Sequence, residues 1–175
     1  MGQLRHIFYA QPYPVAFLEM GTAYIIWTFL MLLLRGKSGR IVACIGVALS
    51  LVLIVKLTIV GRSESGEVVL IPFSALVRGF THPGYLRSAL MNIILFLPFG
   101  LTLPFALPCR VRHKVLITVL AGALLSVGVE VLQLAFALGS TEADDVITNT
   151  LGTLLGATSW QLCVYIRNKY DSWLR

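Results

Sequence analysis

The chain has 175 residues, of which 57% are hydrophobic and 13% are charged, with a formal net charge of +6. Soluble domains carry about 25% charged residues, so this chain has too few charges to cover a soluble globule. Intrinsic disorder is excluded as well, because it requires low hydrophobicity and high net charge. The composition therefore predicts an integral membrane protein, and the length predicts a single domain over residues 1–175.

Five apolar stretches are long enough to cross a bilayer, whose core of about 30 Å needs roughly 20 apolar residues in a helix. They cover residues 15–34, 41–60, 88–107, 115–138 and 146–166. A sixth apolar run, residues 68–77, is too short to span and contains Pro72. We therefore predict an all-α integral membrane protein of five transmembrane helices, with a short interfacial or re-entrant segment between the second and third. The first run has no small-residue cleavage site, so we expect a span and not a signal peptide.

Polar residues interrupt the first three predicted spans. Glu19 and Lys56 each lie about one turn below the same membrane surface, where an ion pair between helices is an alternative to a functional role. In the third span, Arg87 lies at the rim and Asn92 about one turn deeper. Further along that span, Pro98 removes a backbone hydrogen bond and predicts a kink or a break.

The fourth span carries the deepest predicted charge. Glu130 lies some eight residues before the end of this span, and Gln133 shares its helix face at a spacing of three. An ionisable side chain in hydrocarbon is a functional candidate by default, and a low dielectric suits a general acid or base. A structural ion pair between Glu130 and Arg87 is the alternative.

The acidic residues that precede the fifth span allow three interpretations. Glu142, Asp144 and Asp145 could stabilise the helix N-terminus, where negative charge is favourable. They could instead bind a basic ligand or pair with an arginine. They could also hold a divalent metal on a diphosphate, because clustered oxygen ligands suit Mg²⁺ and Ca²⁺. Asn149 follows Asp145 by four residues and lies on the same helix face.

Small residues predict where the last two spans meet, because they allow close backbone approach in lipid. The two stripes are Gly122, Ser126 and Glu130 in the fourth span, and Asn149, Gly152 and Gly156 in the fifth. We expect these spans to pack against each other and to bring Glu130 near Asn149 and Asp145.

The distribution of basic residues predicts the orientation. With the N-terminus outside, nine lysines and arginines lie in the cytoplasm and four lie outside, which the positive-inside rule favours. The nine are Arg35, Lys37, Arg40, Arg110, Arg112, Lys114, Arg167, Lys169 and Arg175, and the four are Arg5, Arg62, Arg78 and Arg87. The predicted topology thus places the C-terminus inside and the acidic loop outside.

Four ordered blocks resemble the VanZ-like family. They are LIPF at 70–73, NIILFLPFG at 92–100, ExxQ at 130–133 and DDxxxNTLG at 144–152, within a match of residues 70–157. The resemblance implies a small bacterial membrane protein associated with resistance to teicoplanin-type lipoglycopeptides. The family-motif positions are Pro72, Asn92, Pro98, Gly100, Glu130, Gln133, Asp144, Asp145, Asn149 and Gly152. Many members have an arginine shortly before the acidic run, where this chain has Gly139 and Ser140.

The favoured function is binding of a lipid-linked envelope precursor or a lipoglycopeptide in an outward-facing polar pocket. The predicted binding residues are Arg78, Arg87, Asn92, Glu130, Gln133, Asp144, Asp145 and Asn149. The alternative is an enzyme that acts on a lipid-linked or diphosphate substrate, with Glu130 as the candidate catalytic residue and Glu142, Asp144 and Asp145 as weak candidate metal ligands. Transport is a third, less favoured class. We expect membrane lipids as partners, no nucleic acid and no cofactor other than such a metal.

Overall fold

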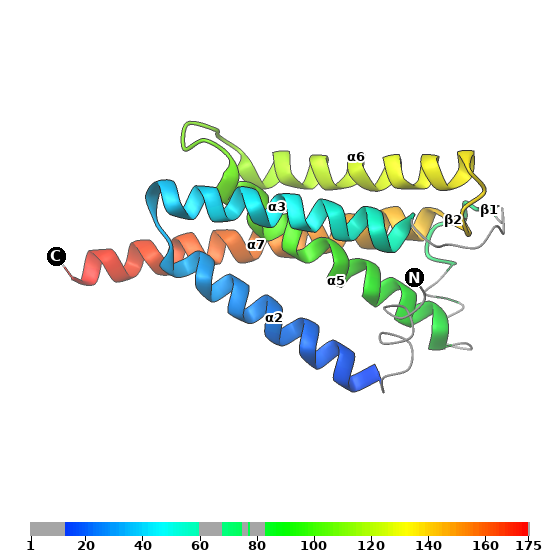
Figure 1. Ribbon diagram of the computed structural model, residues 1–175, viewed down its shortest axis with the longest axis horizontal. Coiled ribbons are helices and arrows are strands. Elements are labelled where there is room, and N and C mark those ends of the chain that lie inside the picture. The colour runs from blue at the N-terminus through cyan, green and yellow to red at the C-terminus, as the bar shows by residue number, and fades with distance from the viewer. Residues whose placement is uncertain (1–12, 60–67, 75–76, 78–82, 175) are drawn as a thin grey trace.

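The computed structural model describes residues 13–59, 68–74, 77 and 83–174, without the side chains of residues 13–19 and 83. The described chain forms a bundle whose helices are α2 (Tyr13–Leu33), α3 (Gly36–Thr58), α5 (Pro83–Ala106), α6 (Lys114–Ala135) and α7 (Ala143–Trp173). Two short strands, β1 (Val68–Val69) and β2 (Thr141–Glu142), lie at one end of it. Helices α3, α6 and α7 run roughly along the long axis of the molecule, and α2 and α5 cross it obliquely (Figure 1).

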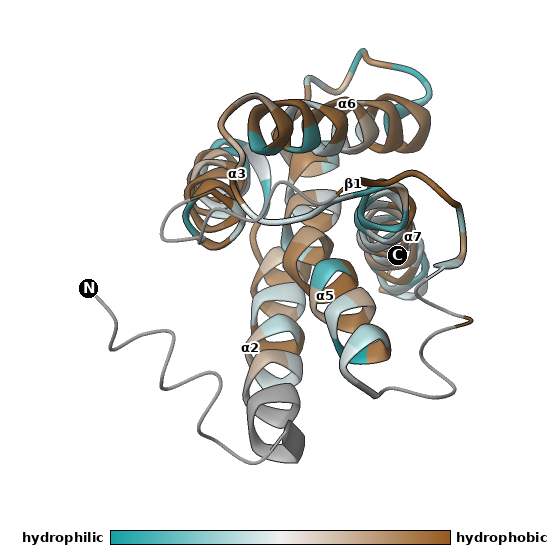
Figure 2. Cartoon of the chain, turned by 90° about the vertical axis from the view of Figure 1, so that its right-hand side faces the viewer, coloured by the Kyte–Doolittle hydropathy of each residue, from teal (hydrophilic) through white to brown (hydrophobic). Residues whose placement is uncertain are grey.

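Helix α5 occupies the centre of the bundle. It contacts α7 most extensively and also packs against α3, α6 and α2. A view along the bundle shows α5 between α3 and α7, with α6 above it and α2 beside it; α3 and α6 consist mostly of hydrophobic residues, and α7 is more mixed (Figure 2). An apolar cluster formed by Ile54, Phe96, Phe99 and Val129 joins α3, α5 and α6.

The two ends of the bundle differ in charge. The α2–α3 and α5–α6 connections lie at the same end as the C-terminus, and β1, β2 and the start of α7 lie at the other (Figure 1). The first end, which we call the basic end, carries Arg35, Lys37, Arg40, Arg110, Arg112, Lys114, Arg167 and Lys169. The second, the acidic end, carries Glu142, Asp144 and Asp145. At the basic end, Arg35 pairs with Asp171 at 2.8 Å, and Arg167 donates a hydrogen bond to the carbonyl oxygen of Met31.

The bundle buries polar side chains and exposes apolar ones. Its buried polar residues are Ser50, Thr58, Asn92, Thr102, Thr118, Ser126, Glu130, Gln133, Thr141, Asp144, Asn149 and Thr153. Its exposed residues include large aliphatic side chains along α2, α3 and α6, such as Ile25, Ile41, Leu49, Leu124 and Val131. Soluble monomers rarely expose large contiguous apolar surfaces, so this arrangement suits a lipid surrounding.

Three of the five predicted spans are confirmed as helices long and apolar enough to cross a membrane: Gly36–Thr58, Gly84–Ala106 and Lys114–Ala135. The described apolar part of α2, Met20–Leu33, is shorter, and α7 is long but carries many polar residues. The first and fifth spans therefore stay predictions. The helix ends also differ: α6 stops at Ala135, short of the predicted 138, because Ala137 has a positive φ and Leu138 turns back to bond the carbonyl oxygen of Gln133.

The glycines of α7 face α5, whereas the sequence stripe predicted contact with α6. A Cβ atom on Gly152 would lie 2.2 Å from the carbonyl oxygen of Ile93, and one on Gly156 would lie 2.2 Å from that of Leu97. The predicted approach of α6 to α7 also occurs, at Gly122 against Thr153. Helix α7 contacts both α5 and α6. Its glycines Gly152 and Gly156 pack against α5, whereas the side chain of Thr153 packs against Gly122 of α6.

Helix α5 continues through Pro98 and Pro104 as one α-helix, so of the predicted kink or break at Pro98 the break does not occur. Nearby polar groups bond backbone carbonyls around the two prolines. The hydroxyl of Thr102 donates to the carbonyl oxygen of Pro98 at 2.7 Å. The ammonium of Lys114 donates to the carbonyl oxygens of Pro104 and Leu107, both at 2.9 Å. Lys114 thereby bonds carbonyl oxygens at the end of α5, where the helix itself supplies no N–H partners.

Candidate functional site

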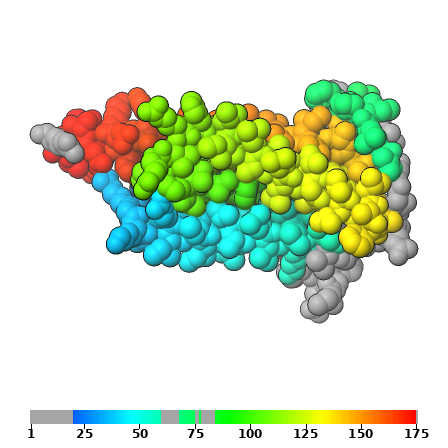
Figure 3. All heavy atoms as spheres, turned by 90° about the horizontal axis from the view of Figure 1, so that it is seen from above, coloured from blue at the N-terminus to red at the C-terminus, as the bar shows by residue number. Residues whose placement is uncertain are grey.

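The segment after β1 is attached to the acidic end of the bundle. Strand β1 pairs in parallel with β2, with Val68 opposite Thr141 and Val69 opposite Glu142. Beyond β1, the carboxylate of Asp144 accepts hydrogen bonds from the backbone N–H of Phe73 and, at 3.1 Å, from the hydroxyl of Ser74. A space-filling view shows the segment lying beside the ends of α6 and α7 (Figure 3). Its described part thus forms a strand and a turn rather than a span, as its length predicted.

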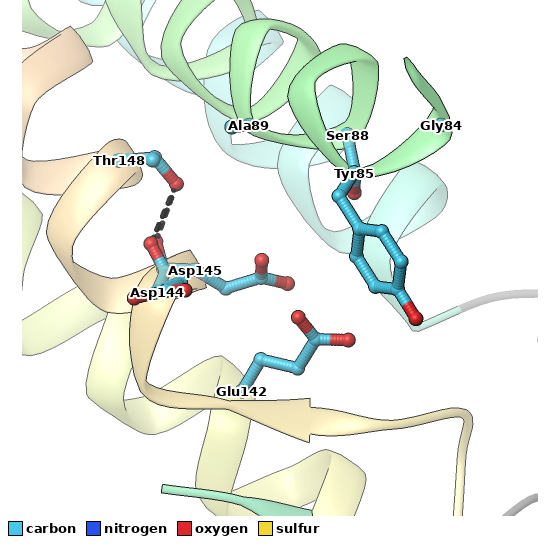
Figure 4. Close-up of a pocket in the computed structure, with 8 residues that line it drawn as sticks. All are labelled: Gly84, Tyr85, Ser88, Ala89, Glu142, Asp144, Asp145 and Thr148. Atoms are coloured by element: carbon cyan, nitrogen blue, oxygen red, sulfur yellow. Dashed lines mark hydrogen bonds between the residues drawn. The ribbon is translucent and has the colours of Figure 1, made fainter. Parts of the chain in front are cut away.

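A pocket of about 300 Å³ opens between the start of α5 and the start of α7 at this end. Its walls are Gly84, Tyr85, Ser88 and Ala89 of α5 together with Glu142, Asp144, Asp145 and Thr148. The carboxylates of Glu142 and Asp145 and the phenol of Tyr85 point toward the space between the two helices (Figure 4). Thr148 instead turns its hydroxyl to the backbone carbonyl oxygen of Asp144, at 2.8 Å. The described wall is therefore rich in hydrogen-bond acceptors.

Glu130 lies behind this wall and is connected to it. Glu130 lies near the end of α6 and is only 7% exposed. Its Oε2 atom accepts a hydrogen bond from the backbone N–H of Glu142 at 3.0 Å. The side chain of Glu142 in turn accepts a hydrogen bond from the hydroxyl of Ser140 at 2.9 Å. The buried carboxylate thus holds the backbone of a residue that lines the pocket.

The other predicted polar residues join helices deeper in the bundle. The side-chain amide of Asn149 donates to the hydroxyl of Ser126 at 2.8 Å, which links α7 to α6. The amide of Gln133 donates to the backbone carbonyl oxygen of Thr58 at 2.9 Å, which links α6 to α3. Asn92 is buried on α5, and within the described structure its amide nitrogen has no hydrogen-bond partner.

The structure divides the residues predicted to form one pocket into two groups. Of them, Asp144 and Asp145 belong to the described wall, whereas Asn92, Glu130, Gln133 and Asn149 lie within the bundle. Arg87 lies on the first turns of α5, next to Ser88 in the chain, and is half-buried. Arg78 and the side chain of Glu19 lie outside the described residues, so the predicted pair of Glu19 with Lys56 stays a prediction. The predicted pair of Glu130 with Arg87 also stays a prediction.

Sequence reasoning missed Tyr85, Ser88 and Thr148 as pocket residues. A signal was present, because Tyr85, Ser88 and Asn92 recur at spacings of three and four residues on one face of α5. Tyr85 was overlooked because the predicted span began only at Ser88, whereas α5 begins at Pro83.

The structure also bears on the three interpretations of the acidic loop. Glu142 is the N-cap residue of α7 but makes no side-chain capping bond, and Asp144 and Asp145 lie in the first helical turn. Both carboxylate oxygens of Asp144 accept hydrogen bonds from the segment after β1. Across the described part of the chain, no three His, Cys, Asp or Glu side chains converge closely enough to hold a metal ion. The predicted metal ligands therefore share a pocket wall without forming a ligand cluster.

Comparison with known proteins supports the resemblance seen in the sequence. The model of the VanZ/LLP1 family matches residues 41–164, a range that includes most of α3, all of α5 and α6, and most of α7. The chain is also similar to "Protein VanZ" of Enterococcus faecium, with 41% identity over 80 residues. That match covers 44% of this chain and 46% of the relative, and thus less than half of either protein. No solved structure matches the chain.

Proposed function

Because the chain belongs to the VanZ/LLP1 family, we propose that it is a multi-pass protein of the bacterial cytoplasmic membrane that lowers susceptibility to teicoplanin-type lipoglycopeptides. In this proposal the pocket at the acidic end binds a lipid-linked envelope precursor or the antibiotic itself. The observation that supports it is the position of the pocket, between two helices that expose apolar side chains and beside a buried carboxylate. A ligand with a polar head and a lipid chain matches both surfaces.

The orientation of the pocket follows from the charge of the two ends. Eight of the described lysines and arginines lie at the basic end. The positive-inside rule places such residues in the cytoplasm. The acidic end, with its pocket, then faces the side from which an antibiotic arrives and on which cell-wall precursors are used.

The acidic side chains of the pocket wall determine which chemical groups of a ligand can bind there. Carboxylates of Glu142 and Asp145 accept hydrogen bonds, so they favour an amine or hydroxyl group of a peptide or sugar. A phosphate would be repelled by this wall and needs a cation. In the proposal Arg87 on α5 and Arg78 supply it, because arginine binds phosphate through paired N–H groups.

Resistance measurements with isosteric variants test this proposal. The double variant Glu142→Gln, Asp145→Asn keeps the shape of the wall and removes its charge. We expect it to lower the teicoplanin concentration tolerated by the cell about tenfold, because a hydrogen bond to a charged group is worth about 1.5–3 kcal/mol. Asp171→Asn at the basic end is the matched control and should leave resistance unchanged. Full resistance in the double variant, at equal protein amount in the membrane, would exclude the pocket.

The burial of Glu130 favours a second candidate, an enzyme that acts on a lipid-linked substrate. A carboxyl group in a low-dielectric setting can exchange a proton with a substrate, so the proposed chemistry is carried by Glu130 alone. Mass spectrometry of envelope lipids separates the two functions. Binding leaves the lipid inventory unchanged with and without the protein, whereas an enzyme creates a new species that disappears in Glu130→Gln.

A further inference from the structure

A second, larger cavity lies at the basic end of the bundle. Its volume is about 840 Å³, and it lies between the first turns of α6 and the middle of α7. The lining residues fall into an apolar group on the two helices and a polar group near the α5–α6 connection. This cavity is separate in sequence and position from the pocket at the acidic end.

The apolar wall lies on the surface of the bundle rather than in its core. Val115, Leu116 and Val119 form the α6 side, and Leu154 forms part of the α7 side. Leu116 is 57% exposed and Leu154 is 39% exposed. Exposed aliphatic side chains adjoin both residues on their helices, with Ile117 and Leu120 next to Leu116 and with Leu151 and Leu155 next to Leu154. The groove is therefore open to whatever surrounds the bundle and suits a hydrocarbon chain.

The polar part of the cavity is positively charged. Lys114 and His113 line it, and the neighbouring Arg110 and Arg112 are exposed. The connection 107–113 and the first turn of α6 contain no acidic residue. The Lys114 ammonium lies 5.6 Å from the ring centre of Trp160, which also lines the cavity, and it donates to the carbonyl oxygens of Pro104 and Leu107.

The start of α6 adds a second favourable feature for an anion. His113 is the N-cap residue and makes no side-chain capping bond, so it does not satisfy the first N–H groups of the helix. Such N–H groups and the helix dipole attract negative charge. The cations, the uncapped helix and the apolar groove lie next to one another along residues 110–119.

We propose that this cavity is a binding site for an anionic phospholipid, with the phosphate at Lys114 and an acyl chain along the groove between α6 and α7. Charge complementarity selects an anionic over a zwitterionic headgroup, as in basic pockets between membrane helices. The apolar wall selects a lipid over a free anion. The proposal does not depend on the pocket at the acidic end or on its ligand.

Fluorescence quenching provides the test, because Trp160 lines the cavity. The full chain with Trp27→Phe and Trp173→Phe keeps Trp160 as its single tryptophan. It is reconstituted in phosphatidylcholine that contains brominated phosphatidylglycerol or, at the same mole fraction, brominated phosphatidylcholine. We expect the brominated phosphatidylglycerol to bind about fivefold more tightly than the brominated phosphatidylcholine. One basic residue strengthens the binding of an anionic lipid by about this factor. Equal quenching by the two lipids would overturn the proposal.

Three variants identify the charge responsible. Lys114→Gln should abolish the preference for phosphatidylglycerol, Lys114→Arg should retain it, and Lys37→Gln, at the same end of the bundle, should not affect it. A preference that survives in a folded Lys114→Gln protein would contradict the assigned phosphate position. Because Lys114 also bonds the end of α5, the comparison of the two lipids with the unmodified lysine decides the proposal if that variant fails to fold.

Soluble glycerol phosphate distinguishes a lipid site from a simple anion site. We expect it to leave the quenching by brominated phosphatidylglycerol unchanged, because it cannot occupy the apolar groove. Complete displacement at matched concentration would mean that the cavity binds phosphate alone. Leu116→Phe should weaken lipid binding by filling the groove. The control is Leu124→Phe, because Leu124 is 72% exposed on the same helix and lies outside the cavity lining.

Discussion

Asp144, at the start of α7, accepts a hydrogen bond from the backbone N–H of Phe73, which precedes it by 71 residues in the chain. The same carboxylate accepts a hydrogen bond from the hydroxyl of Ser74, and Asp144 lines the pocket at the acidic end. One side chain thus attaches the segment after β1 to the helix that carries the site. In the proposed function, loss of this attachment disturbs the pocket before it disturbs the bundle.

Replacement of Asp144 by alanine should therefore loosen the segment after β1. The change leaves the Phe73 N–H and the Ser74 hydroxyl without this acceptor, which costs about 1–3 kcal/mol of stability. Hydrogen exchange should show lost protection in 68–74, with the centres of α5 and α6 unchanged. Asp171→Ala is the control, because its ion pair with Arg35 is solvent-exposed and such pairs contribute about 0–1 kcal/mol. Unchanged exchange at 68–74 would contradict this role of Asp144.

The contact between α5 and α7 should not tolerate an added methyl group. In Gly152→Ala the new Cβ would lie 2.2 Å from a backbone oxygen of α5, so the two helices must move apart. Overpacking of this kind costs about 1–3 kcal/mol. Gly128→Ala on α6 is the matched control, because no atom lies within 4 Å of its Cβ position. Thermal unfolding in detergent should show a lower midpoint for Gly152→Ala alone, and equal midpoints would refute the close contact.

The hydrogen bond between Asn149 and Ser126 should couple α7 to α6 by a modest amount. A double-mutant cycle with Asn149→Ala and Ser126→Ala measures it without the contributions of lost packing. We expect a coupling free energy of about 0.6 kcal/mol and no more than about 1.7 kcal/mol, the range for hydrogen bonds between membrane helices. A coupling of zero within error would mean that the two side chains do not interact in the folded protein.

The sequence was sufficient for the helical class and for the main spans, because apolar runs of membrane length leave few alternatives. It also identified Glu130, Asp144 and Asn149 as residues of interest, since polar groups inside apolar runs are conspicuous. All three are buried and hydrogen-bonded side chains at the acidic end or deeper in the bundle.

The partners of these residues could not be predicted from the sequence. Helical spacing shows which residues share a face, but it does not show which neighbour that face meets. The stripe of Gly152 and Gly156 was therefore assigned to α6, although it lies against α5. The bonds from Phe73 to Asp144 and from Gln133 to Thr58 link segments more than 70 residues apart, and no local pattern encodes them.

In the proposed function, the pocket at the acidic end faces the outside of the cell, and cysteine labelling tests this orientation directly. Ser88, exposed at the pocket, and Ser38, exposed at the basic end, are replaced singly by cysteine in a chain that lacks Cys44, Cys109 and Cys163. Intact cells are treated with an impermeant maleimide, and permeabilised cells show that both positions can react. We predict labelling of intact cells at position 88 and not at position 38. Labelling at 38 and not at 88 would contradict this prediction, because the pocket would then face the cytoplasm.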